Sequence, residues 1–177
     1  RAHKKTERTT PLAIAVPEKH PSGLLSAGLP LGVNCELPFA LNAQFDPETS
    51  RHRLAHRRWN EWLFDRLADV ASAVAVHRFA EKPSTGWISV PLSEEAASDD
   101  PWIQCQLADL VAQIQQQALS RARVVADGSP VRLADLVYES ESLTGVLSVG
   151  DQQQLVPEKH PLGKANRDTA GRWRSVL

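Results

Sequence analysis

Apolar residues alternate with smaller or polar residues between positions 36 and 45, with a period of two. The apolar members of this pattern are Leu37, Phe39, Leu41, Ala43 and Phe45. A period of two places these side chains on one face of a β-strand and leaves Asn42 and Gln44 on the other face. Apolar runs at residues 9–16 and 23–31 predict two strands before it, and the short links between the three predict an antiparallel meander.

Further along the chain the apolar positions recur at steps of three and four, which predicts one long amphipathic helix from residue 55 to about residue 81. The predicted buried stripe comprises Trp59, Trp62, Leu63, Leu67, Val70, Ala71 and Val74. Polar residues, among them Asn60 and Asp65, fall mostly on the opposite side of this helix. Pro83 marks its end, because proline disrupts a helical interior.

A second amphipathic helix is predicted from about residue 101 to residue 121. Asp99 or Asp100 can cap its start, where Pro101 suits the first turn. The segments predicted after this helix are a strand at 123–126, a hairpin-type turn at 127–128, a strand or short helix at 131–138 and a partly helical stretch at 139–155. These elements predict an α+β fold, in which an antiparallel or mixed sheet packs against long amphipathic helices.

The chain has 177 residues, a length that fits one domain of ordinary size. We expect a single α+β domain over residues 1–177, with the strands and the long helix in residues 1–92 and a second helix–strand half in residues 93–177. The apolar content of 42% and the net charge of −1 are typical of a globular protein. The absence of methionine and a final segment, 167–177, that reads as the first turns of a helix indicate an internal fragment of a larger protein.

The apolar runs and the cysteines bear on the cellular compartment. No apolar run approaches the roughly 20 residues that span a bilayer, so a membrane partner is not expected. The two isolated cysteines, Cys35 and Cys105, read as buried and reduced core residues. We therefore expect a cytoplasmic protein.

A dense group of basic side chains follows the strand at 36–45. Its members are Arg51, His52, Arg53, His56, Arg57 and Arg58. Arginines gathered in this way suit the binding of phosphate groups. The alternative is a solvated helix start balanced by Glu48, Glu61 and Asp65. Because cations near a helix N-terminus oppose the helix dipole, either these carboxylates or an anionic partner must offset them, and the sequence leaves both open.

Nucleic acid and metal are two other ligands that this region could bind. A nucleic-acid binder usually carries a basic net charge, and this chain is slightly acidic. Trp59 and Trp62 are predicted in the core, which removes them as base-stacking groups. His52 and His56 stand four residues apart, but the surrounding arginines repel a cation, so we predict no metal site. Without a glycine-rich phosphate loop or a nucleophile motif, we do not expect the fragment to be an enzyme by itself.

Four short motifs stand in a characteristic order in this part of the chain. They are Gly-Leu-Pro-Leu at 28–31, Leu-Pro-Phe-Ala-Leu-Asn-Ala-Gln-Phe-Asp at 37–46, Ser-Arg at 50–51 and Trp-Asn-Glu-Trp-Leu at 59–63. This order resembles the segment that follows the ATP-binding domain in sacsin-type and NO VEIN-type proteins. These proteins are relatives of heat-shock protein 90 within the gyrase, heat-shock chaperone, histidine kinase and MutL (GHKL) ATPase group.

The resemblance implies a middle, transducer-like region that couples ATP binding in an upstream domain to conformational change. ATP and Mg²⁺ would be bound mainly by that domain, and no cofactor is expected for the fragment alone. Middle domains of this group commonly direct a basic side chain to the γ-phosphate, where it neutralises developing charge. The resemblance assigns this catalytic role to Arg51, with Arg53 next. The further residues that would contact phosphate or water are Asn42, Gln44, Arg57 and Arg58.

The partner implied by the resemblance is the upstream ATP-binding domain of the same chain, and a homodimer is a further expected assembly. The alternative function is a non-enzymatic interaction module. Its basic cluster would dock nucleic acid or an acidic protein.

Overall fold

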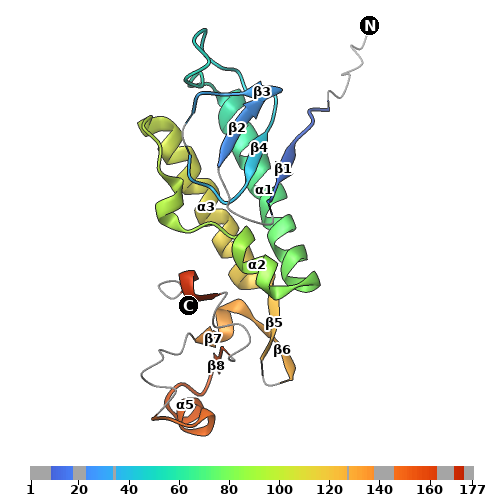
Figure 1. Cartoon of the computed structure of the whole chain (residues 1–177), viewed down its shortest axis with the longest axis vertical. Coiled ribbons are helices and arrows are strands. Elements are labelled where there is room, and N and C mark those ends of the chain that lie inside the picture. Colours follow the sequence, from blue (N-terminus) through green and yellow to red (C-terminus); the bar gives the residue numbers. More distant parts are fainter. Residues whose placement is uncertain are drawn as a thin grey trace, which may run out of the picture.

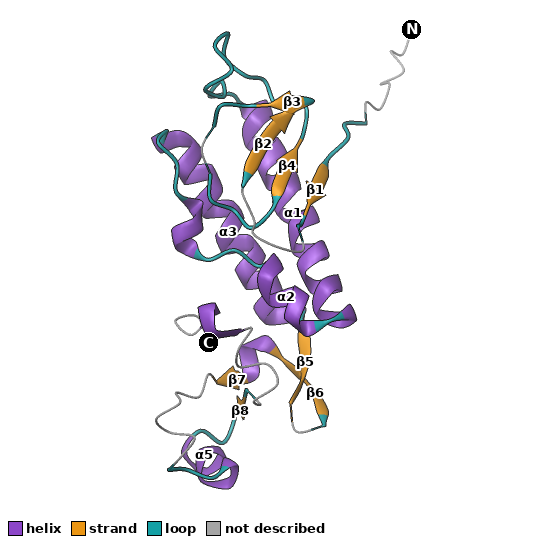
Figure 2. Ribbon diagram, viewed as in Figure 1, coloured by secondary structure: helices purple, strands orange, loops and turns teal. Residues whose placement is uncertain are grey.

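The computed structural model describes residues 9–17, 23–33, 35–126, 128–137, 146–162 and 170–173 (Figures 1 and 2). Its helices are α1 (Arg58–Glu81), α2 (Pro83–Ser89), α3 (Pro101–Arg121) and α5 (Val149–Leu155). Its strands are β1 (Ala13–Ala15), β2 (Leu24–Ala27), β3 (Leu29–Pro30), β4 (Ala40–Asn42), β5 (Arg123–Ala126), β6 (Ser129–Arg132), β7 (Leu136–Val137) and β8 (His160–Pro161). Three short 3₁₀ turns lie at Ser93–Ala96, Leu133–Asp135 and Gly171–Trp173. The predicted α+β class is confirmed.

The first four strands form a mixed sheet in the order β1-β4-β2-β3. Strand β4 pairs with β1 in antiparallel fashion and with β2 in parallel fashion, so Leu41 lies opposite both Ile14 and Leu25. The predicted antiparallel meander is therefore wrong. Its second strand is divided at Gly28, whose φ of +74° turns the chain back and makes β2 and β3 a hairpin.

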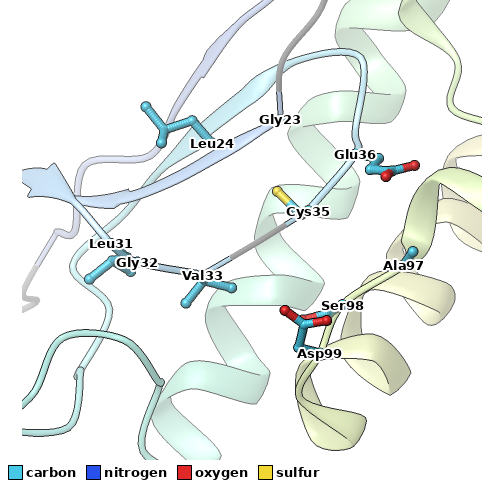
Figure 3. A pocket seen from close by; sticks show the side chains of 10 residues that line it. All are labelled: Gly23, Leu24, Leu31, Gly32, Val33, Cys35, Glu36, Ala97, Ser98 and Asp99. Atoms are coloured by element: carbon cyan, nitrogen blue, oxygen red, sulfur yellow. The ribbon is translucent and has the colours of Figure 1, made fainter.

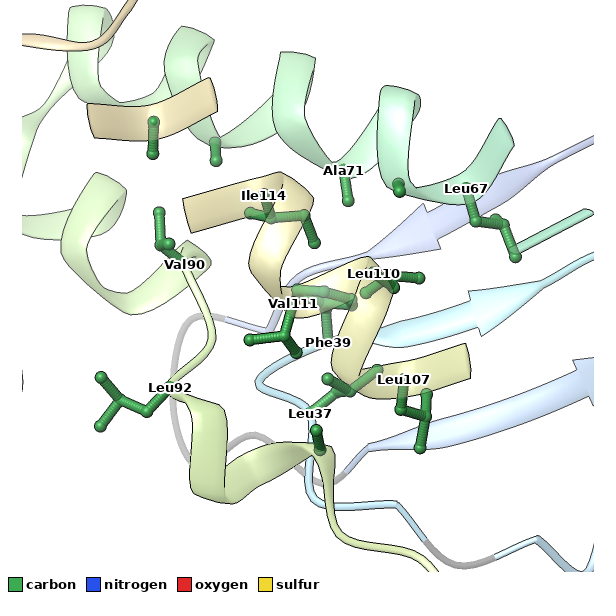
Figure 4. Close-up of a cluster of buried hydrophobic side chains, with 14 of the residues drawn as sticks. Leu37, Phe39, Leu67, Ala71, Val90, Leu92, Leu107, Leu110, Val111 and Ile114 are labelled. Atoms are coloured by element: carbon green, nitrogen blue, oxygen red, sulfur yellow. The ribbon is translucent and has the colours of Figure 1, made fainter. Parts of the chain in front are cut away.

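Helices α1 and α3 run side by side, and the sheet lies over the N-terminal half of α1 (Figure 1). One hydrophobic core joins the sheet region to the two long helices. Its members include Leu37 from the segment before β4, Leu67 of α1 and Leu107 of α3 (Figure 4). The alternating apolar side chains of 37–45 are all buried, as the period of two predicts. Only Ala40–Asn42 of that segment pairs as a regular strand, since Pro38 and Phe39 form a bend and residues 43–45 have no regular secondary structure.

The ends of the helices follow local capping chemistry. The Asp100 carboxylate accepts hydrogen bonds from the backbone N–H groups of Trp102 (2.9 Å) and Ile103 (3.3 Å), which confirms it as the cap of α3. Helix α1 ends where Lys82 becomes extended. Pro83 then begins α2, in the first-turn position that suits proline.

The prediction that Trp59 and Trp62 are core residues is wrong. Their exposed fractions are 42% and 43%. The buried face of α1 instead includes Asn60, Leu63 and Leu67, and the stripe is rotated so that both tryptophans fall outside it. The apolar period alone does not decide this, because a stripe that includes large amphipathic residues can be drawn on the helix in more than one way.

The elements after α3 lie at the far end of the helical pair from the four-stranded sheet (Figure 1). Strands β5 and β6 form an antiparallel hairpin, and β7 pairs with β8 in parallel fashion. The predicted helical character of 139–155 is confirmed for α5. Asp127, residues 138–145 and most of the predicted helix at 167–177 lie outside the described residues. None of the described helices combines the length and the apolar character needed to cross a membrane.

The two cysteines have different environments. Cys35 is buried, and burial raises the pKa of its thiol from 9.0 to about 11. Cys105 is exposed on α3, so the prediction that both thiols are buried is wrong for this one. Both are free thiols.

We expect a thiol reagent to modify Cys105 quickly in the native protein and Cys35 only after unfolding, because the nucleophile is the accessible thiolate. The burial of Cys35 also gives stability a pH dependence. Its thiol stays protonated in the folded state up to about pH 11, whereas the unfolded thiol ionises near 9.0. Stability from this group is therefore complete below pH 9 and is lost as pH rises toward 11. Equal modification rates at Cys35 and Cys105 in the native protein would contradict the expected difference in accessibility.

Candidate functional site

Residues 46–57, here called the basic loop, connect the extended segment after β4 to α1. An isolated antiparallel bridge between Pro47 and Leu54 closes its base. Three backbone hydrogen bonds support this closure: Glu48 N–H to Arg53 O (2.9 Å), Arg51 N–H to Glu48 O (2.9 Å) and Ala55 N–H to Asp46 O (3.0 Å). Leu54 is fully buried beneath the loop. These contacts therefore hold the basic loop in one conformation.

Asn60 fastens both ends of the basic loop to the first turn of α1. Its side chain is fully buried. The Oδ1 atom accepts a hydrogen bond from Asp46 N–H (2.9 Å), and Nδ2 donates to Asp46 O (2.9 Å) and Ala55 O (2.7 Å). The helical pattern placed Asn60 on the polar face, which is wrong. Only its place in the Trp-Asn-Glu-Trp-Leu motif signalled that this asparagine has a specific role.

Arg51 has the one left-handed backbone among the described residues other than glycine, with φ of +57°. This conformation costs about 1–2 kcal/mol for a residue with a Cβ, so surrounding contacts must enforce it. Gly32 N–H donates to Arg51 O (3.0 Å), and the guanidinium Nη2 reaches Leu29 O at 3.4 Å. Residues held in such conformations concentrate at ligand-binding and switching positions.

His52 and Arg53 lie between the segment that follows β3 and the start of α3. They line a small cavity of about 100 Å³ together with Gly32, Val33, Ser98, Asp99, Asp100 and Ile103. A Cβ at Gly32 would come within 2.2 Å of His52 Nδ1, so glycine is what allows the imidazole to lie here. Carboxylates at the start of α3 therefore line the same cavity as these two side chains.

The remaining basic residues lie against α3, against the start of the basic loop and on α1. His56 stacks on Trp102 with ring centroids 4.7 Å apart, and its Nε2 lies 3.8 Å from Asp100 Oδ1. Arg57 forms an ion pair with Asp46. Arg58 begins α1 and makes no ion pair with any described residue. The predicted cluster is thus spread in three directions, toward β3, toward the start of α3 and back to Asp46, with Arg58 on α1 itself.

Asn42 and Gln44, predicted to contact phosphate or water, both have a structural partner. Asn42 Oδ1 accepts from Gly28 N–H (3.1 Å) and so supports the turn between β2 and β3. Gln44 Oε1 accepts from the Thr10 hydroxyl (2.9 Å), next to β1. Both side chains remain exposed, but these bonds direct an acceptor oxygen of each toward the sheet rather than toward the arginines.

A helical pair of metal-binding histidines does not form, because His52 and His56 both precede α1. Within the described ranges, no group of three or more potential metal ligands comes together. A larger cavity of about 510 Å³ lies between the segment 31–36 and residues 97–99 (Figure 3). Among the described residues its ionisable groups are Cys35, Glu36 and Asp99, and none of the described lining residues is a cation, so this part of the lining does not suit a phosphate.

Comparison with protein-family models, with curated proteins and with solved structures finds no match to this chain.

Proposed function

We propose that this chain is a middle, transducer-like domain of a sacsin-like GHKL ATPase, and that the basic loop carries Arg51 toward the phosphates of ATP bound by a neighbouring domain. The motif order from Gly28 to Leu63 is the reason for choosing this family. The observation that carries the proposal is the left-handed backbone of Arg51 within a loop fastened by Asn60.

The chemistry requires a cation that is already in place when charge develops. Bound next to the loop, ATP would supply the phosphoryl group that is transferred, and Mg²⁺ would neutralise part of the phosphate charge. A guanidinium held on a rigid loop stabilises the growing negative charge without a reorganisation cost during the reaction. It also links the presence of the γ-phosphate to the docking of the two domains, which is the coupling expected of a transducer.

Among the basic residues, Arg51 and Arg53 remain the better candidates for phosphate contact. Neither forms an ion pair with a described residue, whereas Arg57 is paired with Asp46. Arg58 is unpaired too, but it lies on the helix rather than on the loop. Asn42 and Gln44 would act indirectly, by supporting the strands on which the loop rests.

The test is ATP turnover by the full-length parent protein with Arg51→Gly, beside Arg51→Lys and Arg53→Ala. We expect Arg51→Gly to lose tenfold or more in turnover, equivalent to about 1.4 kcal/mol of transition-state stabilisation. Glycine relieves the strain of the left-handed backbone, so the free energy of unfolding should be unchanged or rise by up to about 1 kcal/mol. Lysine restores charge but not the guanidinium fork, and should recover part of the rate. If the Arg51→Gly protein turns over ATP as fast as the wild type, Arg51 takes no part in the reaction.

The alternative function, an interaction module for nucleic acid or an acidic protein, is favoured by one observation. Trp59 and Trp62 are exposed, so the expectation that they are unable to stack on bases no longer holds. Titration of tryptophan fluorescence with single-stranded oligonucleotide at two salt concentrations separates the two functions. A nucleic-acid binder shows affinity that falls steeply with salt, whereas a transducer domain binds little at either concentration.

A further inference from the structure

The exposed face of α1 carries two large aromatic side chains with no covering element among the described residues. Trp59 and Trp62 stack on each other with ring centroids 5.2 Å apart and an interplanar angle of 23°. The Trp59 indole is fixed in place, because its Nε1 donates to Gln44 O at 2.8 Å. A rigid, half-exposed tryptophan pair is the kind of feature that anchors protein–protein interfaces.

Charged residues lie on both sides of this tryptophan pair, and the geometry of the helix gives their positions. At 100° per residue, Arg58 and Asp65 lie about 40° and 60° to one side of Trp62, while Trp59 and Arg66 lie about 60° and 40° to the other side. Arg58 and Asp65 form no ion pair with any described residue. One side therefore carries an unpaired cation and an unpaired anion, separated by two turns of the helix.

This pattern is self-complementary. Consider two copies of α1 packed antiparallel about a two-fold axis that passes beside Trp62. The axis keeps each residue on its own side and reverses the direction along the helix, so position 58 of one copy faces position 65 of the other. Arg58 then meets Asp65 twice. Arg66, which pairs with Asp69 of its own helix at 2.9 Å, lies opposite the ring of Trp59 twice, which allows a cation–π contact.

We propose that this face of α1 is a docking surface for a second copy of the chain, with an antiparallel pairing centred on Trp62. The inference does not depend on the proposed ATPase role. Charge selects this occupant over nucleic acid, because Glu61 and Asp65 offset Arg58 and Arg66 around Trp62, which leaves the face without a net positive charge to attract a phosphate backbone. A contact built mainly on one helix face is smaller than the roughly 800 Å² per partner of a standard interface. The dimer is therefore weak, with a dissociation constant on the order of 10–100 µM.

The test is sedimentation of the chain over a hundredfold range of concentration, with charge-reversed variants. Arg58→Asp puts two pairs of carboxylates across the axis, and Asp65→Arg puts two pairs of guanidinium groups there. Each variant alone is expected to dimerise at least tenfold more weakly than wild type. An equimolar mixture of the two restores opposite charges at both contacts, so it is expected to regain wild-type affinity as a heterodimer.

Two further variants complete the design. Trp62→Ala removes the central side chain and is expected to abolish dimerisation, while Asp109→Arg makes the same charge change at an exposed position of α3 and is expected to leave it unchanged. Circular dichroism checks that each variant is folded. A monomeric wild type over the whole range, no recovery in the mixture, or an equal effect of Asp109→Arg would overturn the proposal. Oligonucleotide binding by a monomer, lost in Trp62→Ala, would assign the face to nucleic acid instead.

Discussion

The Asn60→Ala protein is expected to lose about 3–5 kcal/mol of its free energy of unfolding. Asn60 is fully buried and makes three hydrogen bonds to the backbone at both ends of the basic loop. Alanine leaves the N–H of Asp46 and the carbonyl of Ala55 without these partners, and each unsatisfied buried group costs about 1–3 kcal/mol. The carbonyl of Asp46 loses one of two hydrogen bonds and keeps the one from Ala55 N–H. Water that reaches the opened loop recovers part of this loss. Urea unfolding followed by circular dichroism measures it.

Two comparisons show whether the loss of stability comes from the hydrogen bonds between the Asn60 side chain and the basic loop. Asn42→Ala makes the same change at an exposed asparagine with one hydrogen bond to Gly28, and should cost less than about 1 kcal/mol. Trypsin should cut Asn60→Ala after Arg51 or Arg53 much faster than wild type, because the loop is no longer fastened. If Asn42→Ala is equally destabilising, or the cleavage rate is unchanged, Asn60 does not hold the loop.

Replacing Trp87 by alanine is expected to destabilise the protein by about 3–5 kcal/mol, for a different reason. Trp87 is fully buried and joins three parts of the chain. Its ring meets Phe79 of α1 edge-on, with centroids 5.0 Å apart, and lies 5.9 Å from Trp173 near the C-terminus. Alanine therefore leaves a large cavity at the end of the helical pair, where rigid rings on both sides limit collapse.

The Trp87→Phe protein is the matched control. The indole Nε1 of Trp87 is buried and donates no hydrogen bond to a described residue, so phenylalanine removes an unsatisfied donor together with part of the ring. We expect it to cost less than half as much as alanine. Thermal unfolding monitored by calorimetry compares the two variants with wild type. A loss below about 1 kcal/mol for Trp87→Ala would mean that the C-terminal segment does not pack on this side chain in solution.

Local chemistry made much of the fold predictable from the sequence. The alternation at 37–45 identified the buried face of that segment, because a period of two needs no information about neighbouring strands. Asp100 and Pro101 identified the start of α3, because capping is decided within a few residues. The position of the basic loop was also predictable, since a run of arginines after an extended segment is visible in the sequence alone.

The sequence could not give the directions in which those arginines point. Arg51 lies beside β3, Arg53 faces the start of α3, and Arg57 turns back to Asp46. These directions depend on the left-handed backbone of Arg51 and on the hydrogen bonds of Asn60 to both ends of the basic loop. A buried asparagine that bonds to the backbone at two distant points has the same sequence pattern as a solvated one.

The sequence by itself thus determined the two long helices, the cap of α3, the alternating core segment and the presence of a cationic loop, because each of these depends on residues close together in the chain. It did not predict α2. Tertiary structure decided the parallel pairing of β2 with β4, the burial of Asn60 and the exposure of Trp59 and Trp62. The physical reason is that the neighbouring layer, made of α3 and the sheet, covers only one sector of α1. Which sector it covers is fixed by the summed packing of many residues, and no periodicity within the helix records that choice.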